Sequence, residues 1–359
     1  MEVAHKIDRF LRLMNDRGAS DFHLTVGRPP MLRVSGGIEK IRYRTVSEID
    51  YTEMVRPVSP PQRWQEFCDC GDTDFAYELP GVARFRVNLF RQQRGPGAVF
   101  RVIPSKIMTI EQLSLPPQIR RLTQIGGGLV LVTGPTGSGK STTLAAIIDL
   151  INETRKYHII TIEDPIEFVH SNKQSLIHQR EIGSHARSFS EALKAAARED
   201  PDLVLVGEMR DLETISMALE AAEKGTIVFG TLHTNNAVKS IDRIINVFPS
   251  SEQEGVRHMI GDCLRAVIAQ QLLPKVGGGR CAAFEILFSS APVANMIREG
   301  KTGQITSTIQ TGVKQGMIDM DSSIRKLFED NLVTARAAYE KAIDKDNFKD
   351  LLEAGTVVE

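Results

Sequence analysis

Cysteine and tryptophan are scarce in this 359-residue sequence, which contains four cysteines and one tryptophan. The cysteines form no C-x-x-C pair and no framework typical of a secreted disulfide protein, so we expect free thiols and a cytoplasmic location. A structural zinc site normally takes four nitrogen or sulfur ligands, and Cys68 and Cys70 have no further ligands at suitable spacing. We therefore expect no zinc site there.

A strong net charge and long hydrophobic runs are also lacking. The formal net charge is −1, which gives the protein as a whole no electrostatic reason to bind nucleic acid or an anionic membrane. No uninterrupted apolar stretch of about 20 residues is present, and residues 1–18 alternate charged and apolar residues at helical spacing. We therefore expect neither a membrane-spanning helix nor a signal peptide.

What is present is enough apolar sequence for two folded domains, since 42% of the residues are hydrophobic and a domain usually has roughly 100–200 residues. Residues 3–14 have the pattern of an amphipathic helix. Strand patterns follow at residues 21–24, 30–34, 38–43, 73–78, 83–92 and 98–103. The sequence thus predicts an N-terminal α/β domain over residues 1–103, with arginines along one face of its sheet, and a proline-bracketed linker over residues 104–118.

A second α/β domain is predicted over residues 119–291. The apolar run at residues 129–133 is typical of a buried parallel strand, and the residues after Lys140 have a helical pattern. Three more apolar runs are found at residues 157–162, 203–206 and 226–230, with helical patterns between them at residues 189–198 and 212–224. This alternation predicts a parallel sheet with helices on both faces. Residues 292–359 are predicted to be mainly helical.

The segment GPTGSGKST at residues 134–142 follows the first of these strands and opens the helix after it. Its glycines allow the loop to curl so that backbone N–H groups point at phosphate oxygens, and the helix N-terminus favours negative charge. In this pattern Lys140 reaches the β- and γ-phosphates of a nucleoside triphosphate, and Ser141 ligates Mg²⁺. The predicted nucleotide-binding residues are Thr136, Gly137, Ser138, Gly139, Lys140, Ser141 and Thr142. The segment therefore predicts a site for ATP and Mg²⁺.

Two acidic clusters follow predicted strands: HIITIEDPIE contains Glu163 and Asp164, and DLVLVGEMRD contains Glu208. Ligand-binding groups of open α/β sheets collect outside the carboxyl ends of the strands. We therefore expect four strand-end residues to converge, which are Lys140, Glu163, Glu208 and His233. Phosphoryl transfer needs a carboxylate near the metal and a group that orients the attacking water. We assign Glu163 as the general base and Glu208 as the organiser of Mg²⁺, and the reverse assignment stays open.

His233 ends the apolar run in GTLHTNNA, where its side chain is placed to hydrogen-bond the γ-phosphate; the alternative is a purely structural histidine. The transition state of phosphoryl transfer also needs positive charge, which an arginine of a neighbouring subunit often supplies. The N-terminal sheet offers Arg84, Arg86, Arg91, Arg94 and Arg101. We choose Arg86 and Arg101 as the residues that reach a neighbour's nucleotide and expect the others to be ordinary surface charge.

The four motifs that contain Lys140, Glu163, Glu208 and His233 together resemble those of one family, the secretion-type hexameric ATPases of type IV pili and type II secretion. Within this family they most resemble the pilus retraction ATPases. GPTGSGKST is similar to the family's Walker A motif, TIEDPIE to its Asp box, LVLVGEMRD to its Walker B motif and GTLHTNNA to its His box. The resemblance covers nearly the whole chain, including DFHLTVGRPPMLRV near the N-terminus. The segment PVANMIRE at residues 292–299 resembles the AIRNLIRE box of the retraction ATPases, with Ala294 in place of its first arginine.

The resemblance implies an N-terminal PAS-like domain, a RecA-like ATPase core and a ring of six subunits, with nucleotide between one core and the neighbour's N-terminal domain. It implies a Mg-dependent ATPase that drives retraction of type IV pili and hence twitching motility. The implied partners are an inner-membrane platform protein and other components of the pilus base, with membrane association through these partners only. No nucleic-acid partner is expected.

Other functions fit part of the pattern. An extension or type II secretion ATPase shares the core, but those proteins normally carry a further N-terminal domain and a tetracysteine zinc motif, which we do not expect here. A nucleic-acid translocase needs a basic channel or an aromatic stacking platform, which one tryptophan, five tyrosines and near-zero net charge do not favour. A nucleotide-gated scaffold would not need both carboxylates, and a small-molecule kinase would need a recognisable acceptor pocket. The retraction motor is therefore the preferred function.

Overall fold

The computed structural model describes residues 5–34, 36–103 and 106–355. The chain divides into two compact units, which are Met1–Lys106 with Pro165–Val169, and Ile107–Asp164 with His170–Glu359. Residues 3 and 4 of the first predicted helix and residues 104 and 105 of the predicted linker lie outside the described residues. Within the rest of that linker, Ile110 and Leu115 are buried in the core of the second unit. That part of the linker is folded onto the second unit, and the domain boundaries otherwise remain predictions.

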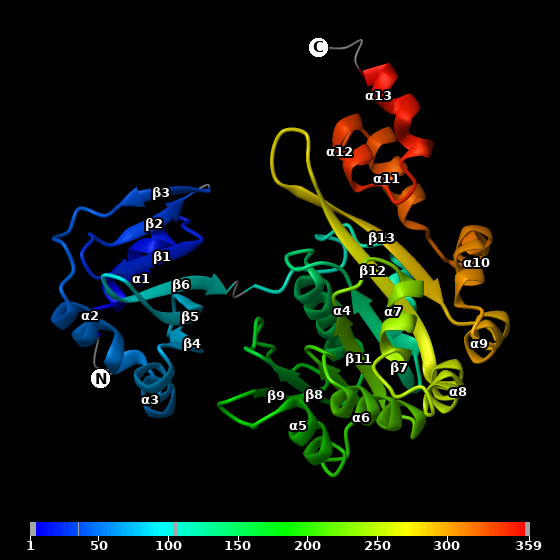
Figure 1. Ribbon diagram of the computed structural model, residues 1–359, viewed down its shortest axis with the longest axis horizontal. Helices are drawn as coiled ribbons and strands as arrows, with labels where there is room; N and C mark the ends of the chain where they lie inside the picture. Colours follow the sequence, from blue (N-terminus) through cyan, green and yellow to red (C-terminus); the bar gives the residue numbers. More distant parts are fainter. Residues whose placement is uncertain (1–4, 35, 104–105, 356–359) are drawn as a thin grey trace. The chain divides into compact units, whose positions relative to one another are not determined.

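The first unit is built on a six-stranded antiparallel sheet with the strand order β3-β2-β1-β6-β5-β4 (Figure 1). The strands are β1 (Asp21–Thr25), β2 (Met31–Val34), β3 (Gly37–Lys40), β4 (Asp72–Leu79), β5 (Ala83–Gln92) and β6 (Gly95–Ile103). Each overlaps a strand predicted from the sequence. The helices are α1 (Asp8–Asp16), α2 (Glu48–Val55) and α3 (Pro61–Cys70). Only α1 was predicted.

Alternate residues of this sheet point to an apolar face and a charged face, because successive side chains of a strand point in opposite directions. Phe22 and Phe100 lie side by side in register and are fully buried. The neighbouring residues Asp21, Arg101 and Arg86 are also in register, across β1, β6 and β5, and lie on the opposite face. The predicted arginine-bearing face of the N-terminal sheet is thus confirmed.

The second unit contains a seven-stranded sheet with the order β13-β12-β7-β11-β10-β8-β9. The strands are β7 (Gly128–Thr133), β8 (His158–Glu163), β9 (Leu176–Glu181), β10 (Leu203–Val206), β11 (Ile227–Leu232), β12 (Leu264–Pro274) and β13 (Arg280–Phe288). All neighbouring strands run parallel except β13, which is antiparallel to β12. The parallel sheet is confirmed for the four predicted strands, whereas β9, β12 and β13 were not predicted and β13 makes the sheet mixed.

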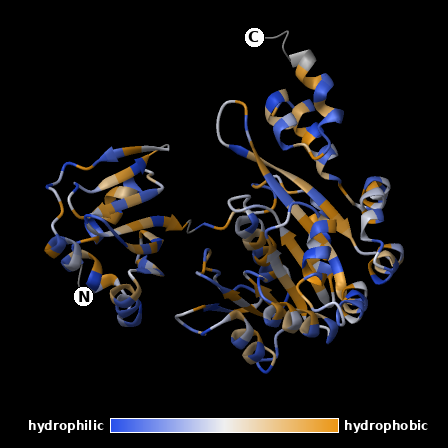
Figure 2. Cartoon of the chain, viewed as in Figure 1, coloured by the Kyte–Doolittle hydropathy of each residue, from blue (hydrophilic) through white to orange (hydrophobic). Residues whose placement is uncertain are grey.

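Helices cover both faces of this sheet. They are α4 (Lys140–Thr154), α5 (Phe189–Ala196), α6 (Leu212–Glu223), α7 (Ala237–Ile245) and α8 (Gln253–Cys263). Every residue of β7, β10 and β11 is buried, which requires cover on both sides of these central strands. Figure 2 shows the central strands as predominantly hydrophobic segments. The core of the second unit therefore surrounds the strands from which the predicted site extends.

The C-terminal region is helical, as predicted. It comprises α9 (Ala291–Arg298), α10 (Ile305–Thr311), α11 (Met320–Glu329), α12 (Ala335–Lys341) and α13 (Lys349–Gly355). Met320, Ile324 and Ala338 are buried in one cluster with Ala269 of β12 and Ala283 of β13. Helices α11 and α12 are thus packed on the β12–β13 hairpin through a small core of their own.

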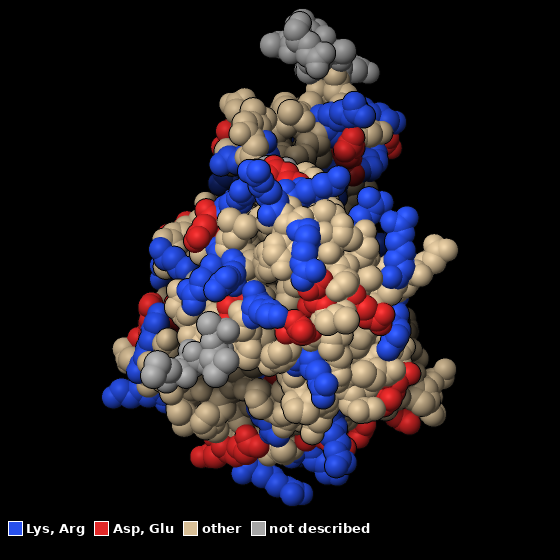
Figure 3. Space-filling model, turned by 90° about the vertical axis from the view of Figure 1, so that its left-hand side faces the viewer, with Lys and Arg blue, Asp and Glu red and all other residues tan. Residues whose placement is uncertain are grey.

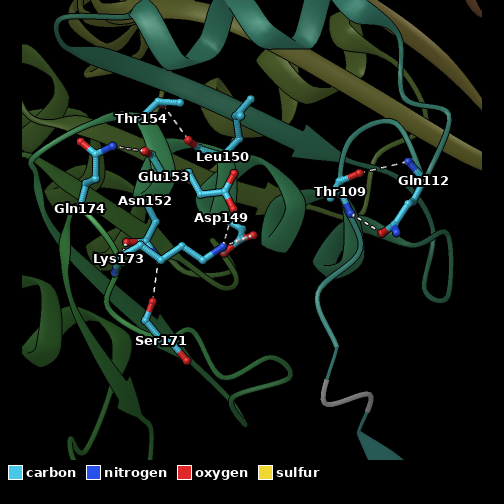
Figure 4. A network of polar contacts seen from close by, with 10 residues as sticks. All are labelled: Thr109, Gln112, Asp149, Leu150, Asn152, Glu153, Thr154, Ser171, Lys173 and Gln174. Atoms are coloured by element: carbon cyan, nitrogen blue, oxygen red, sulfur yellow. Dashed lines mark hydrogen bonds and ion pairs between the residues drawn. The ribbon is translucent and has the colours of Figure 1, made fainter.

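The helix that follows the predicted phosphate loop, α4, is anchored at its C-terminal end (Figure 4). Lys173 donates hydrogen bonds to the carboxylates of Asp149 and Glu153, at 2.8 and 2.7 Å. The buried Asn152 donates to the carbonyl of Ser171 at 2.8 Å and accepts from the backbone N–H of Lys173 at 3.0 Å. The segment between β8 and β9 therefore fixes the direction in which α4 points.

Candidate functional site

The loop between β7 and α4 contains three glycines with left-handed backbone conformations. The φ angles are 147° at Gly134, 76° at Gly137 and 88° at Gly139. A Cβ atom at Gly134 would lie 2.3 Å from the carbonyl oxygen of Gln270 and 2.6 Å from the Oγ atom of Ser138, and one at Gly139 would lie 2.9 Å from the Nε2 atom of Gln270. Since no side chain fits at Gly134 or Gly139, the loop closes against β12 only with glycine there.

Two side chains of this loop suit it to phosphate. The Nζ atom of Lys140 donates hydrogen bonds to the carbonyl oxygens of Gly134 and Pro135, at 2.8 and 3.1 Å, so the ammonium group lies over the loop backbone. Ser138 is buried, and within the described part of the chain its Oγ atom has no hydrogen-bond partner. A buried hydroxyl without a partner costs about 1–3 kcal/mol, which a ligand oxygen would recover. The loop therefore fits the predicted triphosphate group.

Gln270 supports the loop from β12 and was not predicted as a functional residue. Its side chain is buried and accepts a hydrogen bond from the Oγ1 atom of Thr143 at 2.7 Å. Thr143 lies in the first turn of α4, where its backbone N–H donates to the carbonyl of Gly139 at 3.0 Å. Gln270 thus contacts Gly134 at the beginning of the loop and Thr143 in the helix that follows the loop. Only the pairing of β12 with β7 reveals this role, because the sequence around Gln270 carries no motif.

The other predicted site residues follow neighbouring parallel strands. Strands β7, β11, β10 and β8 lie next to one another in this order. The last residues of β7 and β11 are in register, and the last residue of β10 is in register with the next-to-last residue of β8. Four site segments are therefore at one edge of the sheet: Gly134 and His233 directly follow β7 and β11, Glu208 comes two residues after the end of β10, and Glu163 ends β8. This confirms the expected convergence of the strand ends.

Glu208 and His233 are in direct contact, with the Nε2 atom of His233 2.9 Å from the Oε1 atom of Glu208. Arg210 forms an ion pair with the same carboxylate. The hydrogen bond to Glu208 raises the pKa of Arg210 above its usual value. Arg210 was not predicted, although its place two residues after Glu208 in a strand-end segment was a usable signal.

Glu163 is oriented by two side chains. Its Oε1 atom accepts hydrogen bonds from the Oγ1 atom of Thr161 at 2.7 Å and from the Nε2 atom of Gln179 at 3.3 Å. The end of β10 approaches β8 at Gly207, whose N–H donates to the carbonyl of Ile162 at 2.7 Å. A Cβ atom at Gly207 would lie 2.9 Å from that carbonyl oxygen and 3.2 Å from the Cα atom of Glu163. This close approach explains the glycine in the segment GEMRD.

Arg86 and Arg101 lie side by side on the charged face of the first unit. The Nε atom of Arg101 is 2.8 Å from the buried carboxylate of Asp21, and the Nε atom of Arg86 is 3.5 Å from Asp74. Burial raises the pKa of Asp21, but hydrogen bonds from Ser20 and Arg101 outweigh it and hold the pKa below its usual value. The role of both arginines toward a neighbour's nucleotide stays a prediction.

No dedicated metal cage is formed by the described residues, since no three histidine, cysteine, aspartate or glutamate side chains are placed together to hold an ion. Ser141 and Glu208 would supply a hydroxyl and a carboxylate oxygen, which are the ligands that Mg²⁺ prefers. Its other ligands would come from phosphate oxygens and water, as is usual for this ion. Over the same described residues, no helix is long and apolar enough to cross a membrane.

Known proteins match the chain over almost its entire length. The family model described as type II/IV secretion system protein matches residues 70–345. The type IV pilus retraction ATPase PilT of Pseudomonas aeruginosa is 49% identical over 342 residues, which are 95% of this chain and 99% of that relative. A twitching motility protein of Neisseria gonorrhoeae is 50% identical over 319 residues, which are 89% of this chain and 85% of that relative.

Among solved structures, the pilus retraction motor PilT with bound ADP has a TM-score of 0.89 and 43% sequence identity, and the match covers 96% of this chain and 99% of that chain. The family match includes the phosphate loop and the strand ends that carry Glu163, Glu208 and His233. Sequence, fold and the arrangement of the site thus agree, and the chain belongs to the type II/IV secretion system protein family.

Proposed function

We propose that this protein is an ATP-hydrolysing hexameric motor that powers the retraction of type IV pili, and hence twitching motility. The observation that carries the proposal is the edge of the second sheet, where the glycine-shaped loop with Lys140 and the contacting pair Glu208 and His233 follow parallel strands. The full-length similarity to a pilus retraction ATPase and a twitching motility protein supports it.

The loop binds the nucleotide. Its backbone N–H groups and the Oγ atom of Ser138 donate to phosphate oxygens, and Lys140 leaves the carbonyls of Gly134 and Pro135 to neutralise the β- and γ-phosphates. Bound Mg²⁺, held through Ser141 and organised by Glu208, supplies further positive charge at these phosphates. Thr136, Gly137, Gly139 and Thr142 complete the cradle.

Glu163 is the general base for the attacking water. The hydrogen bonds from Thr161 and Gln179 hold its carboxylate in one orientation, and a fixed base is what proton transfer requires. Glu208 is already engaged by His233 and Arg210, which suits an organising role. His233 lies beside Glu208, where it hydrogen-bonds the γ-phosphate. This hydrogen bond is lost when the γ-phosphate leaves, so His233 senses hydrolysis.

The ATPase activity is tested by Lys140→Ala. Without the ammonium group kcat should fall about 100-fold or more, measured as phosphate release with saturating Mg-ATP. Lys156→Ala, an exposed lysine just beyond the other end of α4, is the matched control and should leave the rate unchanged. Turnover that survives Lys140→Ala would refute the assignment of the site.

In the proposed ring, Arg86 and Arg101 of one subunit reach the nucleotide of its neighbour. Lys140→Ala and Arg101→Ala subunits should then both be inactive alone. When they are mixed, some neighbouring pairs combine an intact Lys140 with an intact Arg101, so activity should return. If the rings are shown to exchange subunits and mixing the two variants still gives no ATPase activity, the idea of a site shared between subunits is contradicted.

The proposed partners are an inner-membrane platform protein and other components of the pilus base, which the motor meets at the cytoplasmic side. Deleting the gene should leave cells with excess surface pili and no twitching, and Lys140→Ala should not restore motility. Cells without pili would indicate an extension ATPase instead. A nucleic-acid translocase would show tight, salt-sensitive DNA binding, which the net charge of −1 does not favour. Both basic and acidic side chains are present on the side drawn in Figure 3.

A further inference from the structure

Glu285 is a buried carboxylate of the second unit that the site described above does not use. It lies on β13 between the apolar residues Phe284 and Ile286, opposite Ala269 of β12, and only 6% of its surface is exposed. A buried carboxylate is costly unless it is paired or hydrogen-bonded. Its partners therefore show what the side chain holds together.

Glu285 lies at the starts of two helices. Its Oε1 atom accepts a hydrogen bond from the backbone N–H of Ala237, the first residue of α7, at 2.7 Å. Met320, the first residue of α11, is near enough to the same carboxylate for its backbone N–H to lower the pKa of Glu285. The first N–H groups of a helix have no partner within the helix, and negative charge is favoured there. One side chain thus binds the start of a helix of the nucleotide-binding core and lies beside the start of a C-terminal helix.

The first of these helices, α7, continues directly from the segment that carries His233. The Oγ atom of Ser240 in α7 lies 2.6 Å from the Oγ1 atom of Thr234 and 3.3 Å from that of Thr133, at the end of β7. At the other end of the segment, His233 contacts Glu208. The position of the first turn of α7 therefore sets where His233 stands relative to Glu208.

The second helix, α11, is held to β13 on both sides of Glu285. The backbone groups of Ile286 and Ile318 exchange two hydrogen bonds, of 2.7 and 3.0 Å. The N–H of Phe284 donates to the Oγ atom of Ser323 at 3.0 Å. Since α11 and β13 are held together in this way, a shift of the C-terminal helices reaches Glu285 directly.

We infer that Glu285 is a positioning residue for ATP hydrolysis, which ties the segment of His233 to the C-terminal helices and so keeps His233 aligned with Glu208. The inference rests on the proposed ATPase function. Burial is the main cause that raises the pKa of Glu285 to about 7; the hydrogen bond from Ala237 acts against this rise, and the nearby Asp319 and Asp321 contribute to it. An apolar residue at this position would avoid the cost of burial but could not accept the hydrogen bond from the first N–H group of α7.

The test is a double-mutant cycle with steady-state ATPase kinetics on the full chain. Glu285→Ala should lower kcat by about 2- to 30-fold, the range for a residue that acts through its coupling to the site, with little change in the KM for ATP. In a His233→Ala background the same substitution should have almost no effect on kcat. An equal loss of kcat in both backgrounds would overturn the inference, because it would show general destabilisation.

Two further variants keep the inference falsifiable if Glu285→Ala does not fold. Glu285→Gln keeps an oxygen that can accept from Ala237 and should retain kcat within about twofold, whereas Glu285→Asp keeps the charge but is too short and should behave like alanine. The opposite ranking would refute the positioning role. Ser322→Ala is the matched control, because Ser322 is an exposed residue of the same helix and takes no part in the contacts between α11 and β13 described above. Lys140→Ala tests the ATPase function separately. If turnover survives this substitution, the proposed function fails, whatever the result for the Glu285 variants.

Discussion

The Nε2 atom of His233 lies 2.9 Å from the Oε1 atom of Glu208, although 25 residues separate them in the sequence. Glu208 comes shortly after β10, and His233 directly follows β11, and these strands are parallel neighbours buried on both faces. The contact is therefore set by the sheet. Because each side chain holds the other in place, the two residues are expected to act as one unit.

His233→Ala and Glu208→Gln should each lower kcat by about 100-fold. The double variant should lose little more than the more damaging single change, because residues that share one interaction are not additive. Phosphate-release kinetics on the four proteins give the coupling directly. Asn235→Ala, an exposed residue of the same segment, controls for disturbance of the loop, and losses that simply multiply would show that the pair does not work together.

Glu163→Gln should lower kcat by about 10²- to 10⁴-fold, because the amide cannot accept the proton of the attacking water. ATP affinity should change little, since the hydrogen bonds from Thr161 and Gln179 can still be accepted by the amide oxygen. Single-turnover hydrolysis and nucleotide titration separate these two quantities. Glu254→Gln, an exposed glutamate of α8, is the control, and a near-normal rate for Glu163→Gln would transfer the role of base to Glu208.

Gly134→Ala should reduce ADP affinity at least about tenfold, which corresponds to 1.4 kcal/mol, because its Cβ atom would lie 2.3 Å from the carbonyl oxygen of Gln270. Gly225→Ala provides the comparison, since Gly225 also has a left-handed conformation but an added Cβ there meets no atom within 4 Å. That variant should lose about 1–2 kcal/mol of stability and keep its ADP affinity. Calorimetric titration distinguishes the two, and equal affinities would show that the loop can relax around the methyl group.

The stability of the protein should fall with rising pH through the titration of Glu285. The ordinary pKa of the side chain is 4.5, and burial raises it to about 7 in the folded protein. Below pH 4.5 the group is protonated in both states; between 4.5 and 7 the unfolded chain ionises first, and this lowers the free energy of unfolding until the folded pKa is passed.

Glu285→Gln should therefore gain stability relative to the parent protein between pH 5 and pH 8, by up to roughly 3 kcal/mol. Thermal unfolding at the two pH values measures the difference. Glu254→Gln removes one exposed carboxylate and corrects for the change in net charge. A parent–variant difference that does not grow with pH would contradict the raised pKa.

In the second sheet, the strands that could be predicted are those that are buried on both faces. Strands β7, β10 and β11 are short uninterrupted apolar runs, which sequence patterns identify well. Strand β9, LIHQRE, is a polar edge strand, and β12 and β13 carry Gln270 and Glu285 in their buried interiors. Those polar residues interrupt the apolar pattern. Gln270 contacts the phosphate loop and Glu285 binds the start of α7, and such contacts are visible only in three dimensions.

The same distinction applies to the site. Lys140 and its glycines were predicted because a phosphate loop is a local structure, and the strand ends were predicted because parallel strands share one carboxyl edge. Gln270 was missed because its contact with Thr143 joins β12 to a helix far away in the sequence. Arg210 lies only two residues from its partner Glu208, so the local signal was present but was not used. The roles of Arg86 and Arg101 depend on a second subunit and remain predictions.

The order of strands in the second sheet has a consequence for synthesis of the protein. The phosphate loop follows β7 and Glu163 ends β8, the next strand in the chain, but β11 and β10 lie between them in the sheet. A nascent chain that has emerged only as far as β8 therefore has both groups but cannot yet place them in one site. Non-local pairing of this kind forms late, so the ribosome must release both inserted strands before any hydrolysis can begin. The complete site therefore cannot form until β11, the last of these four strands in the chain, has been synthesised.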